Sequence, residues 1–334
     1  MTLLEKIEGC LLASAIGNAM GSPVECMDYP DIEKKHGRVT DVMDASRLES
    51  EDDNQIGLLL CKAYIEKQGP VISSDLARVW LRDMDPLKFF WCMRNTYEML
   101  RQGVSPRLTG IYNVVTGSAI MAMAPAGIYN AFDPQRAYID AIDIGYMYQP
   151  KQDVDAACVM AACVAEALKP TATADSVVAT ALKFATKEKY VAFDDRKHNN
   201  LHDTIAQAID IAGRYKDVFE VRAELYANCL QWHAIDPTEV LTLTLAIFVA
   251  SQGDTRQAII GGVNVGRDTD TIANLNGALT GALNGIGSVP QEWIGKCSAQ
   301  TISVFKGVAA DMTSLVQKRI GDMKAQVAMC EALG

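Results

Sequence analysis

Two acidic motifs contain the side chains of this sequence that are best suited to chemistry. They read Ser-Glu-Asp-Asp-Asn-Gln at residues 50–55 and Gly-Arg-Asp-Thr-Asp-Thr at residues 266–271, and each precedes an apolar stretch with helical spacing. Carboxylates are favoured in the first turn of a helix, so one acid in each motif can be explained as a helix cap. A cap uses a single side chain, however, and both motifs offer several. If folding brings the motifs together, their like charges would repel strongly, and a bound cation would make such a cluster tolerable.

The ligand atoms of these motifs predict the kind of ion. Carboxylate and hydroxyl oxygens suit Mg²⁺, Mn²⁺ or Ca²⁺ and suit zinc or copper poorly. Two such motifs in one site are typical of a binuclear centre, with ions about 3.5–4 Å apart. Three other interpretations fit less well. The spacing of an EF-hand is missing, the Asp-x-Asp motif of nucleotide-sugar transferases belongs to α/β folds, and Gly-Gly-Val-Asn-Val-Gly at 261–266 lacks a strand–turn–helix unit around it.

The elements that position the motifs are predicted to be helices throughout the chain. Apolar residues between positions 53 and 69 recur on one helical face, for example, and Gly69-Pro70 ends that segment. Alternating strands, a βαβ rhythm and internal repeats are not evident. We therefore expect an all-α fold, a single globular multi-helix bundle over residues 1–334, with loops at 28–50, 100–116 and 190–200.

Two of the expected helices have an unusual content of small residues. Segments 8–23 and 274–290 both carry glycine or alanine at close intervals. Each glycine costs a helix about 1 kcal/mol relative to alanine, so this composition needs a compensating reason. Close approach of two helix backbones is the simplest one. The pattern predicts a central pair of tightly packed helices with the acidic motifs at their ends.

The overall composition excludes several classes of partner. The chain has 334 residues, a net charge of −10 and a pI near 5.0, which argues against nucleic acid and anionic membranes. The first apolar run has neither the basic start of a signal peptide nor the length of a membrane span. The nine cysteines include no Cys-x-x-Cys pair, which favours reduced thiols. We expect a cytoplasmic protein that binds a small molecule, and the sequence does not specify its oligomeric state.

Four stretches of the sequence, in this order, resemble motifs of one known family. Residues 9–25 resemble a glycine-rich opening helix that ends in Gly-x-x-x-Glu, and residues 51–58 resemble a first metal motif, usually Ser/Thr-Asp-Asp-Thr. Residues 116–128 resemble a central glycine-rich loop that ends in Ala-Pro. Residues 266–293 resemble the signature Gly-Gly-Asp-x-Asp-Thr-Ile helix with its following Pro-x-x-Trp turn. The chain thus resembles the ADP-ribosylglycohydrolase family, which includes the dinitrogenase-reductase-activating glycohydrolase, over about residues 5–295. Residues 296–334 would be a C-terminal helical extension.

The resemblance implies an all-α bundle with a binuclear Mg²⁺ or Mn²⁺ centre and a hydrolase acting on N- or O-glycosyl bonds. Family members cleave a glycosidic bond at C1 of a ribose, usually in an ADP-ribose conjugate. The resemblance assigns the metal ligands to Glu51, Asp52, Asp53, Asp268, Asp270 and Thr271.

Further roles also follow from the resemblance. Glu25 and Asp53 are the expected catalytic residues, because a carboxylate can protonate a leaving group or activate water at an anomeric carbon. Gly117 and Ser118 are expected to offer backbone N–H groups to phosphate or ribose oxygens. Tyr112 and Tyr129 flank the central loop and are candidates for stacking on a base. For Glu25 and Ser118, a surface turn and a helix cap are the structural alternatives.

Several positions depart from the family pattern. Glu51 replaces a metal-binding Ser or Thr, Asn18 replaces an Asp, and Ala122 replaces an Arg. Gln149 lies in the region of the usual Thr-His, and Arg267 replaces a signature glycine. Gln149 and Arg267 are therefore expected to contact substrate, although Arg267 could instead pair with Glu51. The expected substrate is a riboside or ADP-ribosylated molecule; the alternative is a catalytically silent relative with a binding or structural role.

Overall fold

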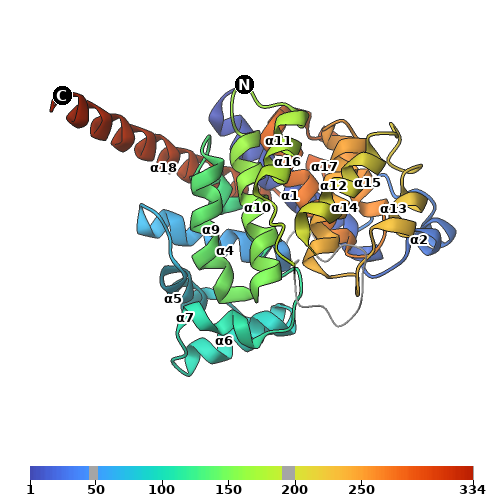
Figure 1. Cartoon of the computed structure of the whole chain (residues 1–334), viewed down its shortest axis with the longest axis horizontal. Coiled ribbons are helices and arrows are strands. Elements are labelled where there is room, and N and C mark those ends of the chain that lie inside the picture. Colours follow the sequence, from blue (N-terminus) through green and yellow to red (C-terminus); the bar gives the residue numbers. More distant parts are fainter. Residues whose placement is uncertain (45–51, 190–199, 334) are drawn as a thin grey trace.

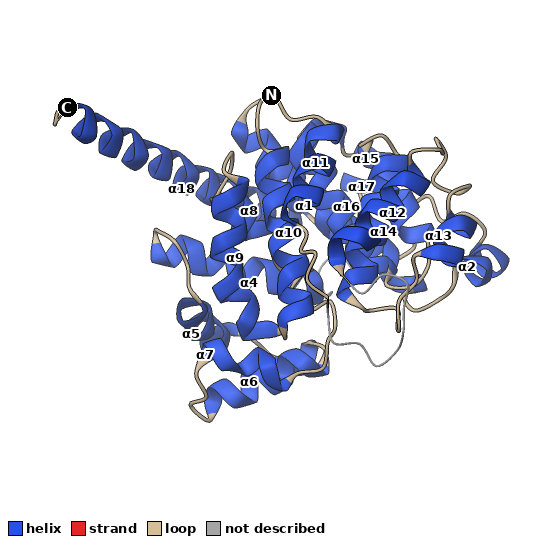
Figure 2. Cartoon of the chain, viewed as in Figure 1, coloured by secondary structure: helices blue, strands red, loops and turns tan. Residues whose placement is uncertain are grey.

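The protein is a bundle of α-helices, as the sequence predicts (Figures 1 and 2). The computed structural model describes residues 1–44, 52–189 and 200–333, and these contain no β-strand, only one isolated bridge between Asp28 and Gly266. Within the same described ranges, no helix is long and apolar enough to cross a membrane.

The helices are named here in their order along the chain. The first half contains α1 (Leu3–Gly21), η1 (Ser22–Val24), α2 (Tyr29–His36), α4 (Asp52–Lys67), α5 (Ser73–Asp83), η2 (Pro86–Lys88), α6 (Trp91–Arg101), α7 (Pro106–Thr109), η3 (Gly110–Tyr112), α8 (Ala124–Tyr129), α9 (Pro134–Tyr148) and α10 (Lys151–Ala167). The second half contains α11 (Ala174–Phe184), α12 (Leu201–Ala212), α13 (Arg222–Asn228), α14 (Pro237–Ala250), α15 (Thr255–Asn264), α16 (Thr269–Asn284), η4 (Ile286–Ser288), α17 (Gln291–Ile294) and α18 (Ala299–Glu331).

Helices α1 and α16 form the buried centre of the bundle, and they are the two small-residue segments of the sequence. A methyl group on Gly17 would clash with the backbone of Ala273, and one on Gly277 would clash with the backbone of Ala13. Glycine is required at these points because the two backbones touch. The predicted pair of tightly packed helices is confirmed.

The two central helices run antiparallel. Gly9 of α1 contacts the α16 residue Gly281, whereas Gly21 at the other end of α1 contacts Thr269 at the start of α16. The Thr269 hydroxyl also donates to the Gly21 carbonyl oxygen at 2.9 Å. This contact brings the end of α1 beside the start of α16, and with it the second acidic motif.

Two of the predicted loops contain helices. Helix α2 lies within 28–50, and α7 and η3 lie within 100–116. Pro30 and Pro106 sit in the first turns of α2 and α7, where proline is favoured because its fixed φ suits a helix start. The third predicted loop lies almost entirely in 190–199, outside the described residues.

Helix α18 begins against α1 and α4 and then leaves the body of the protein (Figure 1). Residues such as Phe305, Met312 and Val316 are buried, whereas positions 321–333 are exposed. The C-terminal helical extension expected over residues 296–334 therefore packs against the body only over its first half.

Candidate metal centre

Beside the acidic site, the turn at Cys26 and the turn at Arg267 are joined by backbone hydrogen bonds. The Cys26 N–H donates to the Arg267 carbonyl at 2.8 Å, and the Arg267 N–H donates to the Met27 carbonyl at 2.7 Å. Cys26, Gly266 and Arg267 all adopt left-handed φ angles of 60°, 82° and 70°. At Gly266 a side chain would also clash with Tyr226. These tight turns fix Glu25, which directly precedes Cys26, beside Asp268.

Three carboxylates converge at this point. Ligand oxygens of Glu25, Asp268 and Asp270 lie within 4.8 Å of one another. Asp268 and Asp270 are buried at the start of α16, while Glu25 is exposed at the end of η1. Glu25, expected from the sequence as an acid or base, is thus part of the same cluster as two expected metal ligands.

Asp53 extends the cluster from the first turn of α4. Its carboxylate is 3% exposed and accepts hydrogen bonds from Asn274 Nδ2 at 3.3 Å and from the Thr271 hydroxyl. Burial raises the pKa of Asp53 well above its ordinary value, and the charges of Asp270, Asp52 and Glu25 raise it further. The two acidic motifs, far apart in sequence, therefore share one electrostatic site.

Asp268 experiences the same environment. Burial raises its pKa strongly, and so do the charge of Asp270 and a hydrogen bond with it. No positive side chain is among the groups that shift either Asp53 or Asp268, and within the described ranges neither makes an ion pair with Lys or Arg. Buried like charges without a counter-charge are unfavourable unless the groups are protonated or hold a cation.

The cluster forms the floor of a pocket of about 290 Å³. Eight of the ten predicted site residues that the structure describes line this pocket. They are Glu25, Asp52, Asp53, Gly117, Ser118, Asp268, Asp270 and Thr271.

A loop before α8 closes one side of this pocket. A methyl group on Gly117 would lie 3.7 Å from Asp268 Oδ2, so the loop backbone runs directly past the cluster. Buried Asp153 holds the loop by accepting from the N–H groups of Ala119 at 2.6 Å and Ile120 at 3.1 Å. Sequence reasoning missed Asp153, whose only signal was an acid in the first turn of α10.

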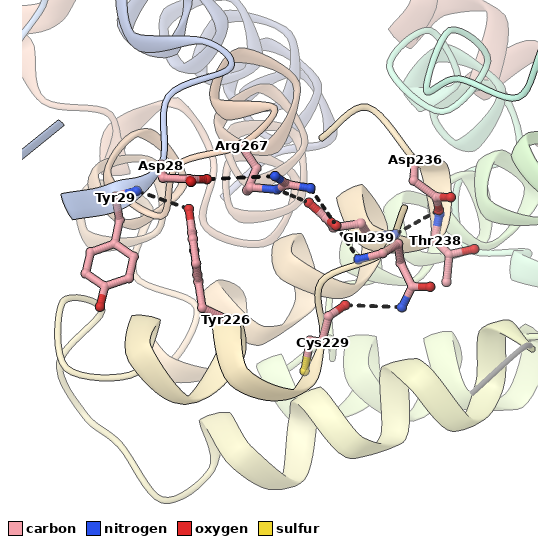
Figure 3. Close-up of polar contacts among 9 residues, drawn as sticks. Asp28, Tyr29, Tyr226, Cys229, Asp236, Thr238, Glu239 and Arg267 are labelled. Carbon is pink, nitrogen blue, oxygen red and sulfur yellow. Dashed lines mark hydrogen bonds and ion pairs between the residues drawn. The ribbon is translucent and has the colours of Figure 1, made fainter. Parts of the chain in front are cut away.

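Arg267 does not line the pocket. Its guanidinium lies between Asp28, at 3.8 Å, and the fully buried Glu239, at 2.6 Å (Figure 3). Burial raises the pKa of Glu239 to about 7, which the hydrogen bond from Arg267 partly counteracts. The contact made by Arg267 ties the turn before α16 to the start of α14, so its evident role is to hold Asp268 in position.

The other predicted residues that the structure describes do not line the pocket. Gln149 is buried behind the pocket and donates from Nε2 to Thr116 Oγ1 at 2.7 Å, and Thr116 in turn lines the pocket. Tyr129 is 6% exposed and stacks on Tyr64, so its ring is used in the core. Tyr112 is exposed but does not line the pocket. Glu51 lies outside the described residues.

The donor set fits a hard divalent cation. Carboxylates and a threonine hydroxyl are oxygen donors, and neither His nor Cys belongs to the converging group found among the described residues. Two buried carboxylates without an ion pair are the observation that most favours a bound cation. Asp52, Asp53, Asp268, Asp270 and Thr271 are the residues that would hold it, with Glu25 beside them.

Comparison with known proteins supports this fold. The family model for ADP-ribosylglycohydrolase matches residues 1–324, and the chain therefore belongs to the ADP-ribosylglycohydrolase family. The match extends beyond the 5–295 expected from the motifs and includes most of α18.

Individual relatives are distant. An uncharacterised protein of Archaeoglobus fulgidus is 24% identical over 304 residues, covering 87% of this chain and 90% of the relative. The uncharacterised protein YegU of Escherichia coli strain K12 is 24% identical over 306 residues, covering 85% and 89%. The solved structure of an ADP-ribosylglycohydrolase-related protein complex superposes with a TM-score of 0.70 at 18% identity, covering 94% of this chain and 99% of that one. This last similarity establishes the fold.

Proposed function

We propose that the protein is a metal-dependent hydrolase that cleaves the glycosidic bond at C1 of a ribosyl group. The observation that carries this proposal is the convergence of Glu25, Asp53, Asp268 and Asp270 on one pocket, where buried Asp53 and Asp268 have no cationic partner among the described residues. Family membership supports a glycohydrolase over other uses of such a site.

Different residues have different roles in this proposal. Asp52, Asp53, Asp268, Asp270 and Thr271 hold Mg²⁺ or Mn²⁺, in a centre that we propose is binuclear. When bound, the ions supply Lewis acidity to the vicinal hydroxyls of the ribose and to a water molecule.

Glu25 transfers the proton. Its exposed carboxylate reaches the edge of the cluster, within 4.8 Å of the oxygens of Asp268 and Asp270, and faces the pocket where a leaving group would lie. A carboxyl group in this position can protonate the leaving group or take a proton from water. The neighbouring backbone of Gly117 and Ser118 orients substrate oxygens.

The first test measures metal binding and hydrolysis together. Metal-stripped protein should melt at a higher temperature as millimolar Mn²⁺ or Mg²⁺ is added, because an ion that binds only the folded state stabilises it. The loaded protein should release ribose or ADP-ribose from at least one member of a panel of nucleosides, nucleotides and ADP-ribosyl conjugates. Metal-dependent melting without any release would favour the silent-relative interpretation.

A matched substrate pair tests the chemistry more sharply. A 2′-deoxyriboside lacks one hydroxyl of the vicinal pair, and loss of one such contact costs about 1–3 kcal/mol. Hydrolysis of the deoxyriboside should therefore be slower by roughly tenfold or more than that of the matching riboside. Equal rates for the two substrates would contradict binding through the diol.

A further inference from the structure

The second half of helix α18 extends away from the body of the protein (Figure 1). Residues 320–331, here called the arm, are exposed except for the half-buried Ile320. Most helical stability in proteins comes from packing one face of the helix, and isolated helices shorter than about 12–15 residues are marginal in water. The described chain leaves most of the arm unpacked, so another surface is expected to cover it.

The arm carries apolar side chains at the spacing of a coiled-coil seam. Steps of four and three residues alternate along α18 from position 309 to position 330, and this alternation corresponds to the a and d positions of a heptad. Ala309 and Val316 are buried against the body. In the arm, by contrast, Met323 is 46% exposed and Val327 is 55% exposed. One continuous seam is therefore covered in the first half of α18 and open in the arm. Its members are Ala309, Thr313, Val316, Ile320, Met323, Val327 and Cys330.

The body adds a second surface beside this seam. The turn at residues 131–133 and the arm line a groove of about 520 Å³. Arg319 holds the base of the arm to this turn, with a guanidinium nitrogen 3.4 Å from Asp133 Oδ2. Phe132 and Met323 give the groove an apolar lining. Exposed apolar surfaces of this kind mark sites of interaction.

The charges beside the seam indicate what covers it. Lys324 and Glu331 each follow a d position, so they lie on the same side of the seam, and neither has an ion pair with the described residues. When two arms pack antiparallel about a two-fold axis near Val327, each Lys324 lies opposite the partner's Glu331. A parallel pair would instead place Arg319 beside the partner's Lys324, which are like charges. The charges on the arm therefore match a second, antiparallel copy of the arm itself.

We propose that the arm is a dimerisation element, covered by a second copy of this chain, with the two arms packed antiparallel along their seams. The partner's arm lies over the groove as well, because seam residues of the arm line it. A two-fold axis uses the same surface on both copies, so the contact closes after two chains and leaves neither arm uncovered. The groove and the pocket of the metal centre share no lining residue, so this inference is independent of the proposed function.

The mass of the full chain in solution tests the proposal directly. Small interfaces give weak dimers, so association is expected at roughly 10–100 µM protein. In analytical ultracentrifugation over a concentration series, the mass should rise from that of one 36.3 kDa chain towards twice this value. A mass of one chain at every concentration up to roughly 100 µM would overturn the inference. That result is also the one expected if a different protein covers the arm.

A pair of matched substitutions shows whether the seam makes the contact. Val327→Glu places a charge in the seam near the two-fold axis and should weaken the dimer by roughly 100-fold or more. Ala325→Glu adds the same charge on the face of the arm away from the seam and should leave the dimer unchanged. Both positions are exposed in the single chain, so the melting temperature of dilute protein should not change. Equal weakening by both variants, or by neither, would contradict the proposed seam.

A charge swap tests the antiparallel arrangement. Lys324→Glu turns two attractive pairs into repulsive ones and should weaken the dimer by roughly tenfold. The double variant Lys324→Glu, Glu331→Lys should restore the affinity, because both pairs are then reversed rather than lost. If Lys324→Glu strengthens the dimer, as a parallel pair requires, or if the double variant does not recover, the inference is overturned.

Discussion

Both ends of the α1–α16 pair contain buried charged groups, but only at one end does the chain itself supply partners of suitable charge. At one end, near the N-terminus, Lys6 is 6% exposed. At the other end lie the carboxylates of Asp53, Asp268 and Asp270, all at most 5% exposed. The same two helices support both sites, so the comparison separates what the fold needs from what a ligand needs.

The Lys6 end is complete within the chain. Its ammonium group donates to four carbonyl oxygens: Ala167 at 2.7 Å, Ala282 at 3.0 Å, Leu283 at 3.1 Å and Lys169 at 3.3 Å. These carbonyls belong to the ends of α10 and α16, where helix dipoles favour a cation. Burial lowers the pKa of Lys6 only to about 8, so the group is charged at neutral pH.

At the acidic end, Asp53 and Asp268 have no cationic partner among the described residues. Burial and mutual repulsion raise the pKa of both Asp53 and Asp268, and no described Lys or Arg pairs with either. A buried charge that is satisfied internally has a structural role, whereas a cluster of unsatisfied like charges marks a place where something binds. The difference between the two ends therefore points to function at one of them only.

The largest effect is expected from a substitution at the acidic end. Asp268→Asn should lower kcat/KM by on the order of 10²-fold or more, since even indirect partners of metal sites are worth 10–100-fold. The variant should also lose the rise in melting temperature that Mn²⁺ produces. The metal-free variant should melt at or above the temperature of the metal-free wild type, because one repelling carboxylate is gone. A large loss of metal-free stability would show that Asp268 is structural.

The second prediction concerns the pair that supports the acidic end. Arg267→Gln leaves buried Glu239 without its cationic partner, which costs about 3 kcal/mol of unfolding free energy near pH 8. Glu239 already has its pKa raised from an ordinary 4.5 to about 7, and loss of Arg267 raises it further.

The pH dependence of this variant follows from the sign of the shift. A carboxyl whose folded-state pKa exceeds its unfolded value favours folding below the unfolded pKa and loses that contribution as pH rises through the folded pKa. The destabilisation by Arg267→Gln should therefore be small near pH 5 and grow towards pH 8 in urea titrations. The double variant Arg267→Gln, Glu239→Gln should recover part of the loss, and a pH-independent loss would contradict this account.

The third prediction tests the Lys6 end. Lys6→Met removes the donor to four carbonyl oxygens, of which those of Ala167 and Ala282 are in buried contacts, and should cost about 2 kcal/mol of unfolding free energy. The Mn²⁺-dependent rise in melting temperature should persist, because the acidic end is untouched. Parallel urea and thermal titrations, with and without Mn²⁺, measure both effects. If Lys6→Met abolished the metal response, the two ends would not be independent.

The smallest expected effect concerns the loop beside the acidic end. Asp153→Asn offers one acceptor where the carboxylate served two N–H groups, so the variant should lose about 1 kcal/mol of stability. The backbone of Gly117 and Ser118 would be held less firmly, and kcat/KM should fall by roughly tenfold. Steady-state kinetics beside urea denaturation would check this, and loss of stability with unchanged kinetics would mean that the loop does not orient substrate.

Much of the architecture could be predicted from local sequence patterns. Apolar periodicity predicted the helices, and closely spaced glycines predicted the central pair, because both depend on residues near one another in the chain. Helices α2 and α7 were missed because short helices that start at proline have little periodicity. The acids of both motifs were found because several carboxylates before a buried helix exceed what a cap requires.

Arg267 and Gln149 show where sequence reasoning stopped. Arg267 lies inside the second acidic motif, and Gln149 lies between two of the motifs along the chain. Both were expected to contact substrate. In the structure Arg267 pairs with Glu239 and Gln149 bonds to Thr116, one layer behind the pocket. The partner of a polar side chain can come from anywhere in the chain, so its identity is not a local property.

The sequence by itself determined the helical class, the pair of helices that must touch, and the set of acids available for a cation, since these follow from residue types and spacing. Only the tertiary structure decided that Glu25 joins Asp268 and Asp270, that the Lys6 ammonium group donates to carbonyls at the ends of two helices, and that the two acidic motifs line one pocket. The physical reason is that burial and pairing depend on distances through space. Those distances are set when packing brings remote segments together.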